Sequence, residues 1–182
     1  MDLRAVEEHI VDVIDHCDGA VAGACAVAAA ISRAFVPGCS LYDMVQAAFY
    51  GAQQGEELAR QRTDIWDYVG PSVVRRLRMA VRLAVNADQD AMDEIRDLIG
   101  SGPAISESVP AAFALLIARR GDVRMAMEDA VNIGDETAAI ACLVGQLGGA
   151  LRGADVFAQE ERTLLDEANQ FDLTAFAEGF LR

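Results

Sequence analysis

Residues 132–153, NIGDETAAIACLVGQLGGALRG, place Asp135, Glu136 and Thr137 directly before a long run of alanine, aliphatic residues and glycine. A run of this length and composition predicts a buried α-helix after the acidic residues. The two acids at its start have two interpretations. Either they cap the helix by accepting its free backbone N–H groups, or they belong to a ligand site at its positive end.

Two segments of the chain are unusually rich in small residues. Glycine recurs every four residues at Gly145, Gly149 and Gly153, and a second segment holds Gly19, Gly23 and the alanine run of 26–30. A glycine inside a helix costs about 1 kcal/mol relative to alanine, so close approach of a neighbouring helix or a ligand must offset it. Packing is the simpler explanation, and it predicts that these two helices lie at the centre of the molecule.

The apolar residues have helical spacing almost throughout, and no segment alternates with the period of a β-strand. We therefore predict an all-α fold, a compact orthogonal multi-helix bundle forming one domain over residues 1–182. Four amphipathic stripes support it: Leu3, Val6, Ile10, Val13 and Ile14; Leu41, Met44, Val45, Ala48 and Ala52; Ala91, Met92, Ile95, Leu98 and Ile99; Leu173, Phe176, Ala177, Phe180 and Leu181.

Turn and cap residues separate the predicted helices. Pro37 and Gly38 divide two of them, and Ser40 with Asp43 resembles a capping box. Further helices are expected to begin near Ser72 and near Asp122. After the loop GSGP at 100–103, Ser106 or Ser108 is expected to cap a helix that carries Pro110 in its first turn.

Charge and composition limit the classes of partner. The chain has 182 residues, a formal net charge of −14 and no lysine, so we expect neither nucleic acid nor an anionic membrane as a partner. Three arginines at positions 75, 76 and 78 could bind a phosphate, but on a helix they spread around its circumference and are more simply solvated. The absence of a signal-like or spanning segment predicts a cytoplasmic protein, in which the four cysteines are reduced and structural.

The second half of the chain carries a set of motifs in a specific order. After the glycine-rich loop come ESVPA at 107–111, AVN at 130–132, and then GDETAAIACLVGQLGGALRG at 134–153. This order resembles the ADP-ribosylglycohydrolase family, which includes the dinitrogenase-reductase-activating glycohydrolases. Upstream, DHCDGAVAGACAVAAAI resembles the family's histidine-containing helix entry and aligns His16 with its histidine. The resemblance covers nearly all of the chain and is weakest over residues 49–99.

The resemblance implies a helical hydrolase with two divalent metals, usually Mg²⁺ or Mn²⁺, held by acids from both ends of a chain nearly twice as long. The family's early GDALG and DDT motifs lie in an N-terminal half that these residues do not match. Its late GGDTDT motif aligns with Gly134 to Ala139, which puts Glu136 and Ala138 on the two metal-binding aspartates. A shift of one residue would put Asp135 and Thr137 there instead. The metal motif is therefore expected to be degenerate, since Glu128 and Asp129 are expected to face solvent.

Three functions remain open. We favour a truncated, non-catalytic binding or interaction module that forms a homodimer to cover its exposed apolar faces. The alternatives are an active Mg²⁺- or Mn²⁺-dependent ADP-ribosyl hydrolase and the C-terminal subunit of a split glycohydrolase whose partner supplies an N-terminal half. No catalytic residue is assigned; the candidates for an ADP-ribose-type ligand are His16, Asn132, Asp135 and Thr137, and those for a metal are Asp135 and Glu136.

Overall fold

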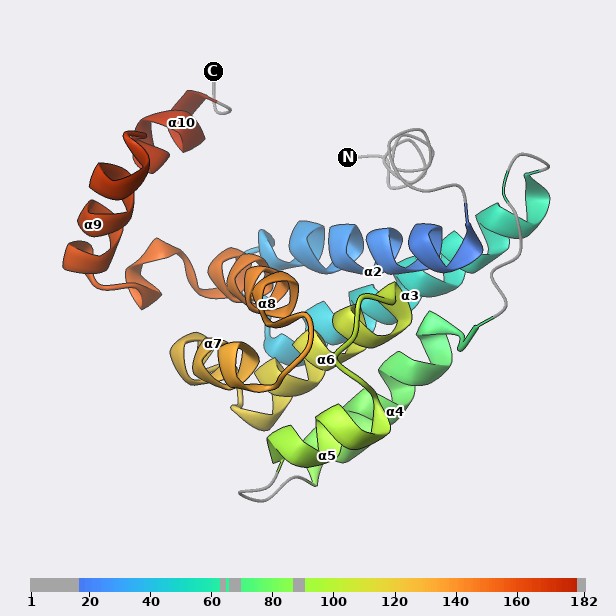
Figure 1. Ribbon diagram of the computed structural model, residues 1–182. Coiled ribbons are helices and arrows are strands. Elements are labelled where there is room, and N and C mark those ends of the chain that lie inside the picture. The colour runs from blue at the N-terminus through green and yellow to red at the C-terminus, as the bar shows by residue number, and fades with distance from the viewer. Residues whose placement is uncertain (1–16, 63–64, 66–69, 87–90, 180–182) are drawn as a thin grey trace.

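The computed structural model describes residues 17–62, 65, 70–86 and 91–179, and these residues are helical without any β-strand (Figure 1). The all-α prediction is confirmed. The helices are α2 (Asp18–Ala34), α3 (Leu41–Gln61), α4 (Val73–Val85), α5 (Ala91–Leu98), α6 (Ile105–Ala118), α7 (Val123–Asn132), α8 (Thr137–Arg152), the 3₁₀ turn η1 (Ala154–Val156), α9 (Gln159–Asn169) and α10 (Leu173–Gly179).

Helix α6 forms the centre of the bundle. Every residue from Ser108 to Leu116 is buried, so the helix is apolar around its whole circumference, as a helix with neighbours on all sides must be. It packs against α4, α8, α7, α5 and α2 (Figure 1). The largest fully buried side chain is that of Phe113, in the middle of this helix.

Helices α2 and α3 form a closely packed hairpin around the Pro37–Gly38 turn (Figure 1). A Cβ atom at Gly51 would overlap the carbonyl oxygen of Cys25 and lie 2.7 Å from Ala29 Cβ. A Cβ atom at Gly55 would lie 2.8 Å from Ala22 Cα. The two backbones approach this closely because α3 presents glycine to the alanine-rich face of α2.

The predicted role of the small residues is confirmed only in part. Gly23 is needed for packing, because a Cβ atom there would lie 2.6 Å from Ile105 Cδ1. Gly149 and Gly153, by contrast, have no atom within 4 Å of a Cβ position, and Gly153 has a φ of +83° where α8 ends. The four-residue glycine repeat is thus not a single packing stripe.

Three of the predicted helix starts are confirmed. Ser40 and Asp43 form a reciprocal capping box, and the Ser40 hydrogen bonds hold the pKa of the Asp43 carboxyl below its ordinary value. Ser72 and Asp122 cap α4 and α7 by accepting backbone N–H groups. The prediction for α6 is wrong: the helix begins at Ile105 after Ala104, and Pro110 is its sixth residue. The start moves upstream because Glu107, in the first turn, accepts the N–H of Gly102 in the preceding loop.

Three of the four apolar stripes fall partly or wholly on residues that the structure describes. The stripe from Leu41 to Ala52 faces the core, as do Ala91, Ile95 and Ile99, whereas Leu98 is exposed. The stripe of residues 3–14 lies outside the described residues, as do Phe180 and Leu181. No helix in the described part of the chain is long and apolar enough to cross a membrane.

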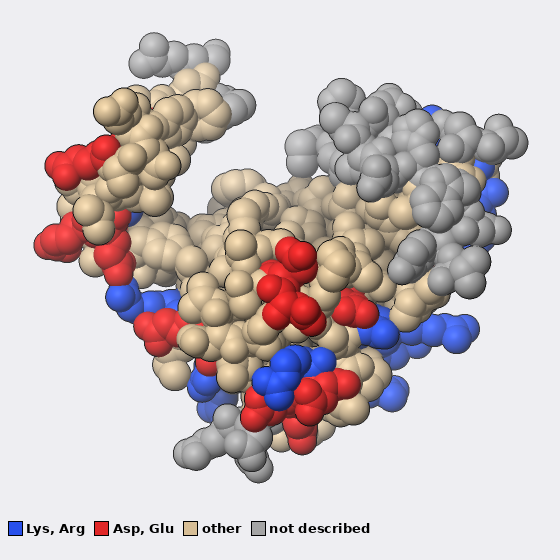
Figure 2. Space-filling model, in the orientation of Figure 1, with Lys and Arg blue, Asp and Glu red and all other residues tan. Residues whose placement is uncertain are grey.

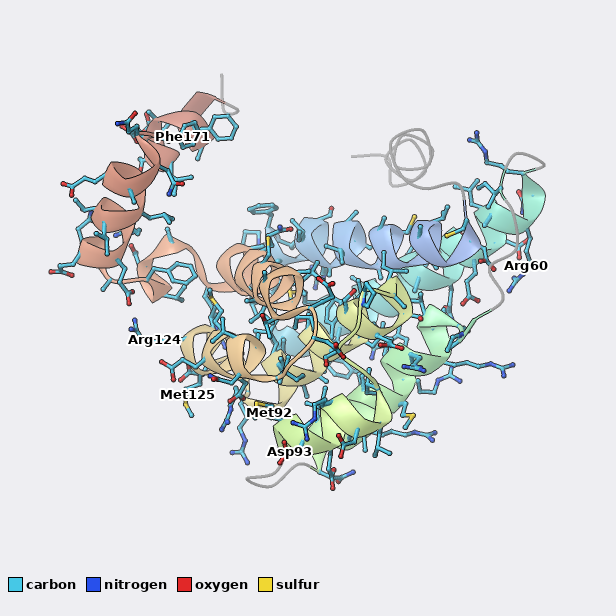
Figure 3. The ribbon with its side chains drawn as sticks, in the orientation of Figure 1. Arg60, Met92, Asp93, Arg124, Met125 and Phe171 are labelled. Carbon is cyan, nitrogen blue, oxygen red and sulfur yellow. The ribbon has the colours of Figure 1, made fainter. Side chains whose placement is uncertain are left out.

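Helices α9 and α10 project from the bundle beyond α7 and α8 (Figure 1). Neither helix contains a buried residue. Their apolar side chains Leu164, Leu165, Leu173 and Phe176 are exposed, as is Phe171 in the turn between the helices. An ion pair joins α9 to the bundle: Arg124 Nη2 on α7 lies 2.7 Å from Glu161 Oε1, and Figure 3 shows Arg124 at the edge of α7. The described part of the predicted C-terminal stripe, Leu173, Phe176 and Ala177, is therefore helical but unburied.

The contact between α9 and α7 is expected to weaken at low pH. The hydrogen bond from Arg124 holds the pKa of Glu161 below its ordinary range, aided by the N–H of Ala158. A carboxyl with a lowered folded-state pKa stabilises the contact fully above its unfolded pKa, near 4.3, and loses that contribution as the pH falls through the lower folded value. Hydrogen exchange of α9, corrected for the intrinsic pH dependence, should therefore rise below about pH 4. A Glu161→Gln variant should exchange faster at pH 7 and lack this transition; an identical transition in both proteins would contradict the assignment.

Candidate functional site

Two loops that carry the sequence motifs meet at the start of α8. The N–H of Glu136 donates to the carbonyl oxygen of Ser101 at 2.9 Å, which joins the loop before α8 to the glycine-rich loop before α6. Acidic side chains gather near the middle of the face shown in Figure 2, over this junction. We call the segments 100–107 and 132–137 the loop pair.

Glu107 holds the first of these loops in place. Its Oε2 accepts the N–H of Gly102 at 3.0 Å, and its Oε1 lies 3.8 Å from Nη1 of Arg76, which also donates to the carbonyl oxygen of Ile99. A Cβ atom at Gly100 would lie 2.6 Å from Glu107 Cδ, and Gly100 has a φ of +94°. The loop therefore needs glycine at position 100, both for its backbone conformation and for the carboxylate packed on it.

The candidate residues of the second loop lie together, and most point to solvent. Asn132 is exposed at the end of α7, where its Nδ2 donates to the carbonyl oxygen of Glu128. Asp135 is exposed, with a φ of +52°, and Glu136 is exposed at the N-cap position of α8. Thr137, the first residue of α8, is half-buried. The fourth ligand candidate, His16, lies outside the described residues.

The capping interpretation is wrong for the side chain of Glu136. Glu136 occupies the N-cap position, yet its side chain accepts no hydrogen bond from the helix, and its backbone N–H is used to bind Ser101. Its φ of −82° and ψ of 50° differ from the extended conformation in which capping side chains turn back onto the helix. The Glu136 side chain is therefore not engaged in the capping role that the sequence suggested for it.

Replacing two acidic residues with alanine should therefore have unequal effects on the stability of the protein. Asp122→Ala should lower the free energy of unfolding by about 1 kcal/mol, because Asp122 Oδ1 accepts the N–H of Met125 at 3.0 Å. Glu136→Ala should change the free energy of unfolding by less than about 0.5 kcal/mol, because it removes only a weak interaction of the carboxylate with the helix dipole. Urea unfolding of both variants gives the comparison. A loss of 1 kcal/mol or more at Glu136 would restore the capping interpretation.

Two serine hydroxyls of the first loop segment are buried without a partner in the described structure. Ser101 Oγ and Ser106 Oγ make no hydrogen bond, although both residues are at most 2% exposed. A buried hydroxyl without a partner costs about 1–3 kcal/mol. Such groups beside a loop junction call for a ligand or water as their partner.

The remaining acids near α8 are engaged elsewhere. Asp129 was expected to face solvent, but it forms a two-pronged ion pair with Arg119, with Nε–Oδ2 at 2.5 Å and Nη2–Oδ1 at 2.8 Å. This hydrogen bonding raises the pKa of Arg119 above its ordinary value. The Asp129 side chain is only 14% exposed because α6 ends beside it and presents Arg119. Glu128 does face solvent, and it pairs with Arg124 at 3.7 Å.

The donors that the structure describes near α8 do not by themselves fit a pair of divalent ions. Mg²⁺ and Mn²⁺ require several oxygen ligands in near-octahedral geometry, normally with more than one carboxylate for two ions. Within residues 17–62, 65, 70–86 and 91–179, no group of three His, Cys, Asp or Glu side chains is placed to hold a metal. Asp135 and Glu136 are two exposed carboxylates beside which no third such ligand is placed among the described residues, and we derive no catalytic step through a metal.

Comparison with known proteins shows which proteins this chain is similar to. A protein-family model described as ADP-ribosylglycohydrolase matches residues 4–182. The chain belongs to the ADP-ribosylglycohydrolase family. It is also 30% identical over 162 residues to the uncharacterized protein YegU of Escherichia coli (strain K12), across 88% of this chain and 46% of that protein. The chain thus spans about half the length of this curated relative, and no solved structure matches it.

The family match spans the loop pair and the rest of the chain from residue 4. The match includes residues 49–99, where the sequence motifs are weakest. Glu107, the glutamate of the ESVPA motif, holds the glycine-rich loop in place. Asn132, the last residue of the AVN motif, is exposed. Sequence reasoning did not identify Arg76 as the partner of Glu107. Arg76 is one of three nearby arginines on a predicted helix, and their spacing indicated only that the three side chains point in different directions.

Proposed function

We propose that this chain is a non-catalytic binding module of the ADP-ribosylglycohydrolase family, with a degenerate metal motif. The observation that carries the proposal is the exposed pair Asp135 and Glu136, which has no third acidic or imidazole ligand placed beside it in the described structure. A dinuclear hydrolase needs more oxygen donors than this pair supplies.

The loop pair is the proposed binding site for an ADP-ribose-type ligand. Asn132 and Thr137 offer an amide and a hydroxyl beside the start of α8, where backbone N–H groups favour an anionic group. The buried hydroxyls of Ser101 and Ser106 lie in the adjoining loop segment without partners among the described residues. Sugar hydroxyls and phosphates are suitable partners for such groups.

Calorimetric titration with ADP-ribose tests this proposal. We expect saturable binding that is equal in Mn²⁺ and in a chelator, is weakened in Asn132→Ala and Thr137→Val, and is accompanied by no release of ribose. Glu160→Gln on α9, which removes an exposed acid far from the loop pair, serves as the control. Metal-dependent binding that is lost in Glu136→Gln or Asp135→Asn would support the hydrolase alternative, and absence of binding would overturn the proposed ligand.

The length comparison favours one further candidate, the C-terminal subunit of a split enzyme. The chain aligns with only 46% of YegU, so acids from a separate polypeptide would be needed for a complete site. The family resemblance implies that such a partner carries the GDALG and DDT motifs. Co-expression with such a polypeptide would yield a Mn²⁺-dependent glycohydrolase if this candidate is correct, whereas an inactive mixture without a stable complex would reject it.

For the binding module we propose that a second copy covers the C-terminal helices. A groove of about 890 Å³ lies between α7, α8, α9 and α10, and it opens at Gly149, where the missing side chain leaves space. Its walls include Met127, Val131, Leu165 and Leu173. Light scattering should show a dimer that Leu165→Arg disrupts and Leu98→Arg does not; the two leucines are 51% and 50% exposed, so the substitutions are matched. A monomeric parent protein would contradict the proposal.

A further inference from the structure

A second groove lies between α3 and α4, apart from the loop pair and from the C-terminal helices. Its volume is about 540 Å³, within the range of about 300–1,000 Å³ that is typical of small-molecule sites. Gln46, Phe49, Tyr50 and Gln53 line it from α3, and Arg78, Val81 and Arg82 line it from α4. We propose that this groove binds a small phosphate ester that carries a planar ring, such as a mononucleotide.

The arginines of this groove have no acidic partner in the described part of the chain. Arg60, Arg96, Arg119 and Arg124 all form ion pairs, and Arg76 is held by Glu107 and Ile99. Arg78 and Arg82 form none with the described residues, and neither do Arg75, Arg120 and Arg152, but only Arg78 and Arg82 line this groove, in a protein with a net charge of −14. Unpaired arginines in such an acidic chain leave a local positive field that an anion would neutralise.

The two guanidinium groups also lie close enough to act on one ligand. Arg78 and Arg82 are four residues apart on α4, so they project from the same face of the helix, about one turn apart. Like charges at this spacing repel each other and destabilise a helix. A phosphate between them would remove this repulsion, and the planar fork of each guanidinium matches phosphate oxygens.

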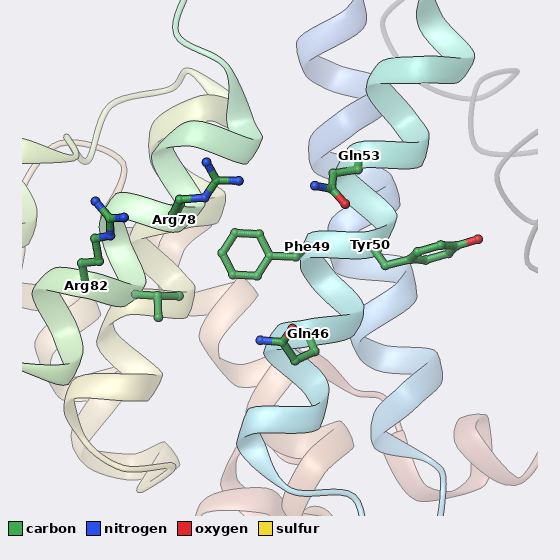
Figure 4. Close-up of a pocket in the computed structure, with 7 residues that line it drawn as sticks. Gln46, Phe49, Tyr50, Gln53, Arg78 and Arg82 are labelled. Carbon is green, nitrogen blue, oxygen red and sulfur yellow. The ribbon is translucent and has the colours of Figure 1, made fainter.

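The opposite wall provides a ring and two amides. Figure 4 shows Phe49 on α3 pointing toward Arg78 and Arg82, with Gln46 and Gln53 one turn to either side. The ring of Tyr50 points away from α4. Phe49 is half-buried, so one part of its ring is fixed by packing and the rest faces the groove. A planar ring of the ligand would cover this apolar surface while the amides bind its polar edge.

The same features exclude a polynucleotide. The net charge of −14 repels an extended phosphate backbone, while a groove of about 540 Å³ accommodates one small molecule. Arg75, the neighbouring cation on α4, does not line this groove, so the positive charge is confined to its two arginines. The ligand class is therefore a single phosphorylated ring compound.

Calorimetric titration of the full chain with AMP, adenosine and inorganic phosphate tests the inference. We expect AMP to bind at least tenfold more tightly than either fragment, and to weaken as salt rises from 50 to 200 mM. Arg78→Ala and Arg82→Ala should each weaken AMP binding about tenfold, and Phe49→Leu should weaken AMP binding but leave phosphate binding unchanged. Arg75→Ala is the matched control, since it removes the same charge from the same helix outside the groove and should leave AMP binding unchanged.

Each other outcome overturns the inference. An equal loss in Arg75→Ala would show a diffuse charge effect, and no loss in Arg78→Ala or Arg82→Ala would place AMP elsewhere. Absence of AMP binding at millimolar concentration would remove the site altogether. Because both arginines are exposed, their variants should retain the parent's thermal midpoint, which confirms folding in the same samples. Asn132→Ala, which weakens binding at the loop pair, should leave AMP binding unchanged; a loss in this variant would place AMP at the loop pair and overturn the inference.

Discussion

Gly51→Ala should lower the free energy of unfolding by about 2 kcal/mol, although alanine is the better helix former. The added methyl group would overlap the carbonyl oxygen of Cys25 and approach Ala29 Cβ to 2.7 Å. Since the first of these atoms is backbone, α2 and α3 must separate over their closest contact. We expect this strain to cost about 3 kcal/mol and the helix propensity of alanine to offset about 1 kcal/mol of it.

Gly149→Ala is the matched control for this substitution. Gly149 is also a helical glycine, but no atom lies within 4 Å of its Cβ position. Alanine should therefore stabilise the protein by up to about 1 kcal/mol. Urea unfolding of the two variants should give changes of opposite sign. If Gly51→Ala were neutral or stabilising, the close approach of α2 and α3 would be wrong.

Glu107→Ala should lower the free energy of unfolding by about 2 kcal/mol, the value typical of a hydrogen bond to a charged group. The substitution leaves the N–H of Gly102 without its acceptor and removes the carboxylate beside Arg76. The loop at 100–103 should then lose protection in hydrogen exchange. ADP-ribose binding should fall with it, because this loop contacts the start of α8 through Ser101 and Glu136.

Two further variants separate the hydrogen bond from the charge. Glu107→Gln keeps an acceptor for Gly102 and should lose less than about 1 kcal/mol. A double-mutant cycle with Arg76→Ala should give a coupling energy of about 0.5–1 kcal/mol, since the 3.8 Å pair is only half-buried. A destabilisation by Glu107→Gln as large as that by Glu107→Ala would show that charge, rather than the bond to Gly102, holds the loop.

Local sequence signals predicted most of the fold. The period of apolar residues located α3 and α5, and the length and composition of the run after Thr137 located α8. The caps at Ser40, Ser72 and Asp122 marked helix starts because each depends on residues only three positions apart. The start of α6 was predicted wrongly because its stabilising contact is less local than a cap. There the N–H acceptor is Glu107 reaching back five residues to Gly102, across a proline that has no N–H to offer.

Long-range contacts could not be predicted from the sequence. The pairing of Asp129 with Arg119, and of Arg76 with Glu107, depends on how α6 lies against its neighbours. The same holds for Gly51, whose contact with Cys25 joins two different helices. The site at the loop before α8 stays a prediction, and the hydrogen bond that the Glu136 backbone N–H donates to Ser101 is a tertiary contact that the sequence did not reveal.

Electron paramagnetic resonance of the full chain during titration with Mn²⁺ tests the central claim most directly. The claim is that this polypeptide alone supplies too few oxygen donors beside α8 for two divalent ions. We expect fewer than two bound Mn²⁺ ions per chain and no spin-coupled spectrum, in the parent protein and in Glu136→Gln alike. Two bound ions with the coupled spectrum of a dinuclear centre, lost in Glu136→Gln, would contradict the claim.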